Sequence, residues 1–417
     1  MKQIRIKGGN TLSGSIEISG AKNSAVALVP ASLLSDGIVT IDNVPAISDI
    51  DALNEILEYL GAKVTREESI MKIDSTSIEN KEIPEEVAKK LRASYYFMGA
   101  LLGKYKKAVM YFPGGCSIGA RPINLHLKGF EALGATVKND GNKYIVEAKE
   151  LKGTKIYLDV ASVGATINIM LAAVKAKGKT IIENAAKEPE IVNVATFLNN
   201  MGAKITGAGT SKIKIEGVEH LEGCFHEVIP DRIEAGTYII AGALCGYNLK
   251  VKNIIPEHIE SLLSKLEEIG VPLERGHDYV IVSKGDTYKA TTIKTAVYPG
   301  FPTDLQQPLT TLLTQCEGKS KVIETIWENR FMHIEYLNKM GTDIKVENQT
   351  AIIKGPSKLI GENIVATDLR AGACMVIAGL KADGETIISS VEHVLRGYEN
   401  IIEKLQNVGA KIELEEI

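Results

Sequence analysis

The chain has 417 residues, which is too long for one ordinary core and predicts two or three domains. Apolar residues make up 45% and charged residues 24%, as in a globular protein, and no apolar run reaches the ~18 residues of a membrane helix. A net charge of −4 argues against a general nucleic-acid-binding protein. The start MKQIRIKGGN lacks the apolar segment of a signal peptide, so we expect a cytoplasmic protein.

A pattern of about 70 residues recurs six times along the chain. Each copy contains an amphipathic helix that ends at a glycine before an alternating strand, as in EILEYLGAKVT and KLEEIGVPLE. A glycine at a helix C-terminus can adopt the positive φ that other residues avoid. The turn glycines are Gly61, Gly134, Gly202, Gly270, Gly341 and Gly409.

A second helix lies about midway between these turns and is apolar on most faces. Its copies contain, in chain order, NSAVALVPASLL, YYFMGALLGKY, GATINIMLAAVKA, EAGTYIIAGALC, LQQPLTTLLTQC and RAGACMVIAGLK. Such helices belong inside a domain, and each is followed by a β-branched strand such as IVTIDNV. We therefore predict an α/β fold of two similar domains, with three repeats in each, buried helices inside and sheets around them. The boundary is expected near Gly217–Pro230.

Polar or charged residues begin the buried helices. Lys22, Arg92 and Ser162 follow one another at intervals of 70 residues. Helix N-termini carry a partial positive charge and free N–H groups, so several of them at one domain end predict an anion site. Asp and Ser are also ordinary N-caps, and for Ser162 and Asp231 both interpretations stay open. A cation there opposes the helix dipole, which favours a functional role for Lys22 and Arg92.

The segment PGGCSIGARP, residues 113–122, has the composition of a loop. A thiol in a glycine-rich loop near an arginine is expected to be exposed and reactive, so Cys116 is a candidate acid, base or nucleophile. The other cysteines are interpreted as small buried hydrophobes: Cys224, Cys245, Cys316 and Cys374. The sequence contains no C-x-x-C pair and no H-E-x-x-H pair, so neither a disulfide framework nor a metal site is indicated.

Three further segments carry ionisable groups near helix starts. In YPGFPTDLQQP, Asp304 is either an N-cap or a general base. WENRFMH contains Arg330, and HVLRGYE contains Arg396. No phosphate-binding glycine motif of the nucleotide-binding folds is present. From the helix starts and the basic residues, we predict a two-domain anion-binding protein with one cysteine loop and one candidate acid–base carboxylate.

With these motifs assembled, the sequence resembles the enolpyruvyl transferases, most closely the branch whose acceptor is UDP-N-acetylglucosamine. The motifs are GAKNS, LRAS, PGGCSIGARPINLHLKGFEALGA, SVGAT, PDRIEAGT, PGFPTDLQ, ENRFMH and TDLRAGA, and the similarity covers essentially the whole chain. The resemblance implies two inside-out α/β barrels. Residues 22–229 would form an N-terminal domain carrying the Cys loop, residues 1–21 and 230–417 a C-terminal domain, and the substrates would bind in the cleft between them.

The resemblance also implies a reaction, namely transfer of the enolpyruvyl group from phosphoenolpyruvate to the 3-hydroxyl of UDP-N-acetylglucosamine. Phosphate is released by elimination from a tetrahedral intermediate, no cofactor or metal is needed, and the step is the first committed one of peptidoglycan synthesis. Lys22, Arg121 and Arg396 would hold phosphoenolpyruvate. Cys116 would protonate its methylene carbon, and Asp304 would take or position the hydroxyl proton. Because Cys116 is retained, inactivation by fosfomycin is expected.

The residues expected to contact the substrates are carried over from the family motifs. They are Lys22, Asn23, Arg92, Arg121, Pro122, Ile123, Asn124, Leu125, Ser162, Val163, Asp304, Ile326, Arg330, Asp368, Arg370 and Arg396. Val163 and Ile326 are expected to contribute main-chain contacts. Val160 stands where some members have lysine, so one uridine or diphosphate contact is missing or replaced.

Two rival functions differ from this hypothesis. The shikimate-pathway enzyme, 3-phosphoshikimate 1-carboxyvinyltransferase, shares the fold and the phosphoenolpyruvate chemistry, but the PGGC loop and the RPINL segment argue against it. A non-catalytic sugar-nucleotide-binding paralogue is disfavoured because the residues assigned to catalysis are all retained. We expect small-molecule substrates as the only partners, and a monomer.

Overall fold

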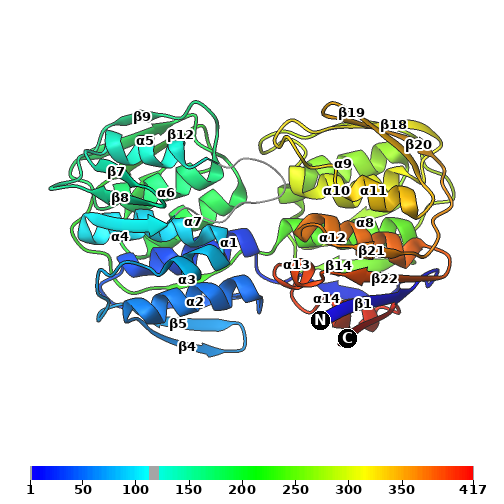
Figure 1. Cartoon of the computed structure of the whole chain (residues 1–417), viewed down its shortest axis with the longest axis horizontal. Helices are drawn as coiled ribbons and strands as arrows, with labels where there is room; N and C mark the ends of the chain where they lie inside the picture. Colours follow the sequence, from blue (N-terminus) through cyan, green and yellow to red (C-terminus); the bar gives the residue numbers. More distant parts are fainter. Residues whose placement is uncertain (1, 112–121, 417) are drawn as a thin grey trace. The chain divides into compact units, whose positions relative to one another are not determined.

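The computed structural model describes residues 2–111 and 122–416, and these residues divide into two compact units. The C-terminal unit comprises the described residues up to Ser19 together with those from Pro230 onward, and the N-terminal unit comprises the described residues between Gly20 and Ile229. In Figure 1 the blue first strand accordingly lies in the same unit as the red end of the chain.

Three nearly apolar helices form the centre of the N-terminal unit. They are α1 (Lys22–Ala31), α4 (Tyr96–Tyr105) and α6 (Val163–Ala173). Almost all of their residues after the first turn are buried, and they belong to one continuous hydrophobic core. Glycine allows their close approach, because a Cβ at Gly99 of α4 would lie 2.2 Å from Oδ1 of Asn168 on α6. The predicted buried helices are therefore confirmed for this half of the chain.

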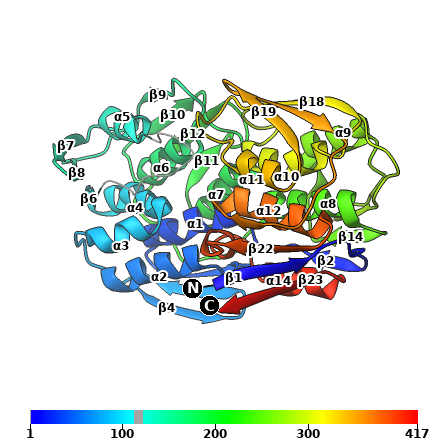
Figure 2. The ribbon, with the colours of Figure 1, turned by 45° about the vertical axis from the view of Figure 1, so that its right-hand side comes forward.

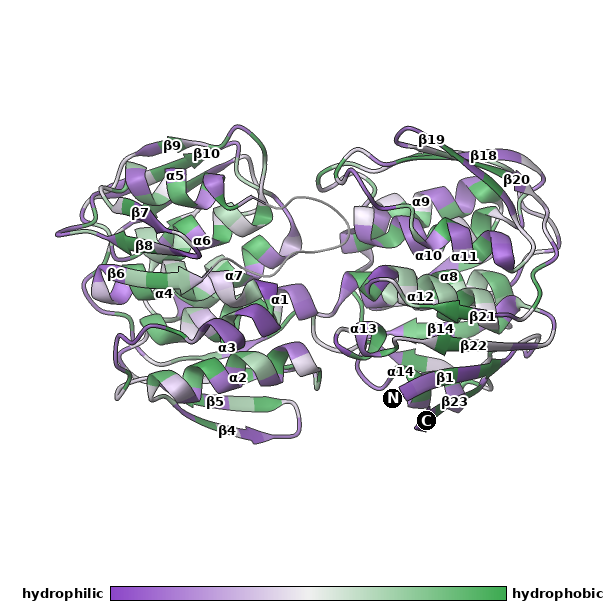
Figure 3. Cartoon of the chain, in the orientation of Figure 1, coloured by the Kyte–Doolittle hydropathy of each residue, from purple (hydrophilic) through white to green (hydrophobic). Residues whose placement is uncertain are grey.

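The C-terminal unit repeats this arrangement with α8 (Arg232–Cys245), α10 (Thr303–Leu313) and α12 (Leu369–Lys381). These helices are largely buried in a second core. Figure 3 shows the mainly hydrophobic colouring of α8 and α12. A Cβ at Gly236 of α8 would lie 2.5 Å from a methyl group of Leu305 on α10, so a small residue again permits the contact.

Three sheets surround the buried helices in each unit. In the N-terminal unit the strand orders are β13-β3-β5-β4, β11-β12-β10-β9 and β6-β8-β7, and in the C-terminal unit they are β15-β16-β14-β2, β17-β18-β20-β19 and β21-β22-β1-β23. Each four-stranded sheet has one parallel pair: β13 with β3, β9 with β10, β2 with β14, β17 with β18, and β21 with β22. The other paired strands are antiparallel.

The strands of the N-terminal unit are β3 (Ile38–Asp42), β4 (Lys63–Glu67), β5 (Ile70–Asp74), β6 (Lys107–Tyr111), β7 (Thr136–Asp140), β8 (Lys143–Glu147), β9 (Lys155–Tyr157), β10 (Lys179–Glu183), β11 (Lys204–Thr206), β12 (Lys212–Glu216) and β13 (Phe225–Glu227). Those of the C-terminal unit are β1 (Lys2–Lys7), β2 (Ser15–Glu17), β14 (Leu249–Lys252), β15 (Leu273–Arg275), β16 (Tyr279–Val282), β17 (Thr292–Lys294), β18 (Gly318–Ile323), β19 (Asp343–Glu347), β20 (Thr350–Gly355), β21 (Asn363–Val365), β22 (Glu385–Ser389) and β23 (Lys411–Glu416).

The remaining helices mostly lie on the outside of each unit and precede the turn glycines. They are α2 (Ser48–Leu60), α3 (Glu85–Lys90), α5 (Asn124–Ala132), α7 (Pro189–Asn200), α9 (Glu260–Ile269), α11 (His333–Lys339), α13 (Glu392–Leu395) and α14 (Ile401–Asn407), with 3₁₀ turns η1 (Ser32–Leu34), η2 (Arg92–Tyr95) and η3 (Pro256–Ile259). The six predicted turn glycines all adopt φ between 97° and 105°. This confirms the repeat that was predicted from their spacing.

The N-terminal strands complete the C-terminal unit. Strand β1 pairs with β22 on one side and with β23 on the other, as Figure 2 shows. Strand β2 pairs in parallel with β14. Among the helices of residues 2–111 and 122–416, none combines the length and the hydropathy that crossing a bilayer would require.

Candidate active site

Asp304 lies in the first turn of α10, and its carboxylate is held between two buried guanidinium groups. Arg330 donates from Nη2 to Oδ1 at 2.7 Å, and Arg370 donates to Oδ2 at 3.2 Å from Nη2 and 3.3 Å from Nε. The two arginine side chains are only 3% and 4% exposed, whereas Asp304 is 26% exposed. Asp304 is not the N-cap, which is Pro302, so the N-cap interpretation was wrong. The carboxylate is instead fixed and accessible, as an acid–base group requires.

Asp368 and Arg370 come from the beginning of α12. Asp368 is the N-cap of this helix, because its Oδ1 accepts hydrogen bonds from the amides of Arg370 and Ala371, each at 2.9 Å. Its other oxygen accepts from Gln307 on α10 at 3.2 Å. Burial lowers the pKa of Arg370, but Tyr398 and Asp304 raise it by more, so the pKa lies above its ordinary value. Arg370 therefore stays cationic beside Asp304.

Arg396 and the start of α8 provide further charge in the C-terminal unit. Arg396 is half-buried and directly follows the short helix α13. Asp231 caps α8 and accepts from the amides of Ile233 and Glu234 at 2.8 and 2.9 Å. The structure thus shows the capping role for Asp231, one of the two roles that the sequence left open.

Lys22 is the first residue of α1 and forms a buried ion pair. Its Nζ lies 2.8 Å from Oδ2 of Asp49 on α2, with the two side chains 12% and 5% exposed. A cation at this position opposes the helix dipole, and Asp49 supplies a structural reason for its presence. The pair also fixes the ammonium at a helix N-terminus, where an anion would be favoured.

The other predicted residues of the N-terminal unit also lie at helix starts, with one difference. Ser162 caps α6 by accepting from the amide of Ala165 at 3.2 Å, and Val163 is the first residue of that helix. Asn124 begins α5. Arg92 begins the 3₁₀ turn η2 rather than the buried helix, which starts only at Tyr96; the prediction that Arg92 begins the helix was wrong by this one turn. Of the remaining positions, Asn23 and Leu125 are half-buried, Ile123 is buried, and Pro122 is exposed.

His126 was missed by the sequence analysis, although it follows the predicted segment directly. Its Nδ1 lies 2.9 Å from Nδ2 of Asn168, and its ring packs edge-on against Tyr95 at 4.9 Å between centroids. Burial, with a smaller effect from Arg92, lowers the pKa of His126 to about 3. The neutral imidazole thus joins α5 to α6 behind the predicted contact residues. The lone histidine in RPINLHLKG gave no signal of this pairing.

Several predictions lie outside these sites or outside the described residues. Cys116 and Arg121 fall in residues 112–121, so the structure does not describe them. Val160, where some family members have lysine, is 61% exposed. The cysteines interpreted as small hydrophobes are buried, except Cys224, which is half-buried. Burial raises the pKa of Cys224 and Cys245 to about 11 and that of Cys316 and Cys374 to about 12, so these thiols are unreactive at neutral pH.

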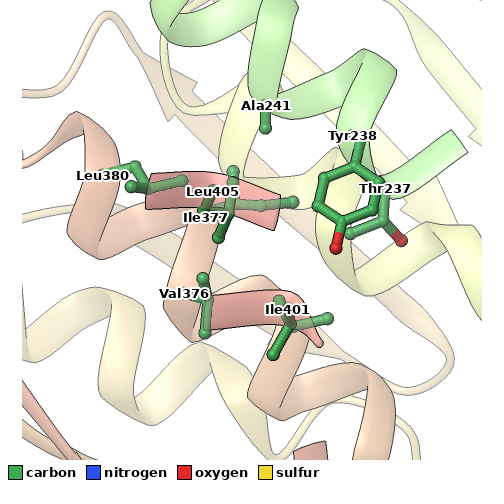
Figure 4. A pocket seen from close by; sticks show the side chains of 9 residues that line it. Thr237, Tyr238, Ala241, Val376, Ile377, Leu380, Ile401 and Leu405 are labelled. Atoms are coloured by element: carbon green, nitrogen blue, oxygen red, sulfur yellow. The ribbon is translucent and has the colours of Figure 1, made fainter. Parts of the chain in front are cut away.

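Among the described residues, neither a metal site nor a phosphate-binding pocket in the core of the C-terminal unit is supported. Within residues 2–111 and 122–416, no group of His, Cys, Asp and Glu is arranged to hold a metal ion. A small hollow between α8, α12 and α14 is lined mainly by aliphatic side chains, with Thr237 and Tyr238 as its polar members (Figure 4). It lacks the cationic groups that a phosphorylated substrate needs.

Comparisons with known proteins identify the family of the chain. The family model of EPSP synthase (3-phosphoshikimate 1-carboxyvinyltransferase) matches residues 6–405. UDP-N-acetylglucosamine 1-carboxyvinyltransferase 2 of Geobacillus kaustophilus is 56% identical over 412 residues, which is 99% of this chain and 96% of that protein. The protein of the same name from Listeria monocytogenes is 55% identical over 410 residues, or 98% and 97% of the two chains.

Solved structures show the same fold. The enolpyruvyl transferase NikO from Streptomyces tendae matches with a TM-score of 0.90 at 26% identity, covering 99% of this chain and 98% of that one. An EPSP synthase from Acinetobacter baumannii matches with a TM-score of 0.74 over 100% of both chains, but at 19% identity it shows a common fold alone. The chain therefore belongs to the enolpyruvyl transferase family, the family of EPSP synthase (3-phosphoshikimate 1-carboxyvinyltransferase).

Proposed function

We propose that the protein transfers the enolpyruvyl group of phosphoenolpyruvate to the 3-hydroxyl of UDP-N-acetylglucosamine and releases phosphate. The observation that carries this proposal is the clamped carboxylate of Asp304, in a chain that is 56% identical over its length to a protein named for this reaction. The step would be the first committed one in peptidoglycan synthesis. A cytoplasmic, monomeric enzyme with two small-molecule substrates is the simplest form of this proposal.

Phosphoenolpyruvate would be held by three cations. Lys22 and Arg396 lie at a helix start and a helix end, and Arg121 would be the third cation. Each charge-assisted hydrogen bond contributes about 1.5–3 kcal/mol, which suits a substrate whose charge approaches −3. Cys116 would protonate the methylene carbon, while fixed cations stabilise the phosphate as it leaves.

Asp304 would take or position the proton of the sugar hydroxyl. Its exposed fraction leaves room for a substrate hydroxyl, whereas Arg330 and Arg370 keep the carboxylate in one orientation. Addition of the hydroxyl oxygen to C2 of phosphoenolpyruvate gives the tetrahedral intermediate. Loss of phosphate and of a methyl proton then gives the enol ether. A preoriented carboxylate adds to the rate because reactants need not reorganise.

The sugar nucleotide would contact residues at several helix starts and the main chain of the turn after β18. The contacting residues would be Asn23, Arg92, Pro122–Leu125, Ser162, Val163, Asp304, Ile326, Asp368 and Arg370. Free amides at the starts of α5 and α6 suit a diphosphate. The exposed Val160 offers no charge of its own to it.

Asp304 allows a direct test of this function. The protein is incubated with phosphoenolpyruvate and UDP-N-acetylglucosamine, and the acceptor is analysed by mass spectrometry for an added enolpyruvyl group. We expect conversion by the wild type and by Asp343→Asn, an exposed aspartate on β19, but not by Asp304→Asn. An unmodified acceptor with the wild type, or full conversion by Asp304→Asn, would contradict the proposal.

A further inference from the structure

Glu324 is a buried carboxylate that immediately follows β18, and four groups donate to it. Its Oε1 accepts from the hydroxyl of Thr295 at 2.9 Å and from the amides of Ile326 and Trp327 at 2.8 and 3.3 Å. Its Oε2 accepts from the hydroxyl of Thr303 at 2.8 Å. Glu324 is only 1% exposed, and it is not among the predicted site residues. A buried carboxylate with this many donors organises the groups around it.

One of these donors connects Glu324 to Asp304. The hydroxyl of Thr303, the first residue of α10, donates its only hydrogen to Glu324 and accepts from Nη1 of Arg330 at 2.8 Å. Nη2 of the same guanidinium binds Asp304 at 2.7 Å. Nε of Arg330 has no partner among the described residues, so the two Nη groups alone orient the guanidinium. The main-chain carbonyl of Arg330 accepts from Nε2 of Gln306 at 2.9 Å.

The other donors shape the turn after β18. The amides of Ile326 and Trp327 both point to Oε1 of Glu324, so the carboxylate acts as the acceptor around which the turn closes. Thr325 adds two bonds to Thr295, from its amide at 2.9 Å and from its hydroxyl at 2.6 Å. The main chain at Ile326, expected to contact the nucleotide, is thus fixed by the same side chain that orients Arg330.

We propose that Glu324 is a positioning residue that couples two parts of the site, the guanidinium of Arg330 against Asp304 and the main chain of Ile326. It touches neither substrate and acts through Thr303 and through the turn. This inference rests on the proposed function, because Asp304 has its role only in that reaction.

The direction of each hydrogen bond makes Glu324→Gln an informative substitution of nearly the same shape. If the new NH₂ group replaces Oε1, it faces two amides and a hydroxyl that all donate to this position. If it replaces Oε2, the hydroxyl of Thr303 faces two donors, the new NH₂ group and Arg330, and its own hydrogen has lost its acceptor. Either orientation leaves buried donors opposed, so the turn or the guanidinium must move.

The test compares four variants by steady-state phosphate release, circular dichroism and the emission of Trp327, the only tryptophan of the chain. In Glu324→Gln we expect kcat to fall about 100-fold, since displacement by 1 Å can have this effect. We also expect a higher KM for UDP-N-acetylglucosamine, an unchanged KM for phosphoenolpyruvate and a shifted Trp327 emission. Thr303→Val should lower kcat and leave the emission unchanged, whereas Thr303→Ser, which keeps the hydroxyl, should behave as the wild type. Glu317→Gln, the same substitution at an exposed position beside β18, is the control.

The outcomes separate this inference from the proposed function. A folded Glu324→Gln whose kinetics and emission match those of Glu317→Gln would overturn the inference, while phosphate release by the wild type would still support the function. If Glu324→Gln does not fold, the Thr303 pair decides: equal kcat in Thr303→Val and Thr303→Ser overturns the coupling to Arg330. If the wild type releases no phosphate, the proposed function fails. The role of Glu324 in the turn after β18 can then still be tested, because unchanged Trp327 emission in Glu324→Gln would overturn it.

Discussion

Replacement of His126 by asparagine should remove one source of acid sensitivity from the N-terminal unit. The orientation of the Asn168 amide is fixed, because its Oδ1 accepts from the amide of Gly99 at 2.8 Å and its Nδ2 donates to the carbonyl of Tyr95 at 2.9 Å. The second hydrogen on Nδ2 must then point to Nδ1 of His126, which is therefore the unprotonated nitrogen. Protonation would bring two donors together inside the core. The side-chain oxygen of asparagine at position 126 can accept from Nδ2 of Asn168 in place of Nδ1 of the histidine, but asparagine does not titrate.

The size of the effect follows from the pKa of His126, which changes from 6.5 in the unfolded chain to about 3 in the fold. A native pKa below the unfolded one means that the unfolded state binds more protons, so the free energy of unfolding falls as the pH falls from 6.5 towards 3. At pH 5 the unfolded imidazole is mostly protonated and the native one is not. The difference amounts to about 2 kcal/mol relative to pH 7.

Urea unfolding followed by circular dichroism at pH 7 and pH 5 measures this effect. His126→Asn changes packing at both pH values, but this change cancels when the wild type and the variant are compared across pH. We expect the stability advantage of the wild type over His126→Asn to shrink by about 2 kcal/mol between pH 7 and pH 5. An advantage that is the same at both pH values would refute the assignment of a buried, neutral His126.

Three more predictions concern other parts of the molecule. Lys404→Met removes the cation that lies 2.6 Å from the carboxyl of Glu234, which is 3% exposed. Burial already raises the pKa of Glu234 to about 7, so urea unfolding should show that the variant loses about 3–5 kcal/mol of stability at pH 8, where the carboxyl is charged, and less at pH 5, where it is protonated. Equal losses of stability at the two pH values would contradict this. Gly99→Ala places a Cβ 2.2 Å from Oδ1 of Asn168, so thermal unfolding should reveal destabilisation of about 3 kcal/mol, and an unchanged melting temperature would show that α4 and α6 are not in close contact. Fosfomycin should alkylate Cys116 and inactivate the enzyme, and Cys116→Asp should resist it; equal sensitivity of the two in a phosphate-release assay would exclude this role of the thiol.

Local requirements explain what could be predicted from the sequence. The turn at Gly61 needs a positive φ that glycine adopts most easily, and an apolar helix such as α6 must be buried whatever its neighbours are. The cap at Ser162 is likewise a local feature, because its hydroxyl binds an amide three residues away. These features depend on short stretches of sequence.

The unpredicted parts of the site depend on which elements meet in the fold. Lys22 pairs with Asp49 on a different helix, and the sequence suggested only that the lysine had a function. The role of Glu324 comes from Thr303, which lies on α10 and has no fixed spacing from the turn after β18. Asp304 has the position of an N-cap in the sequence, but in the fold Pro302 is the N-cap and two arginines bind the Asp304 carboxylate. Tertiary contacts of this kind carry no periodic signal.

Release of inorganic phosphate from phosphoenolpyruvate, measured with UDP-N-acetylglucosamine and with shikimate 3-phosphate as separate acceptors, tests the central claim most directly. Wild type and Cys116→Ala are compared under both conditions. We expect release only with the sugar nucleotide and its loss in the Cys116 variant. Release with shikimate 3-phosphate would assign the protein to the other reaction of this family, and binding of the sugar nucleotide with no release from either acceptor would identify a non-catalytic paralogue.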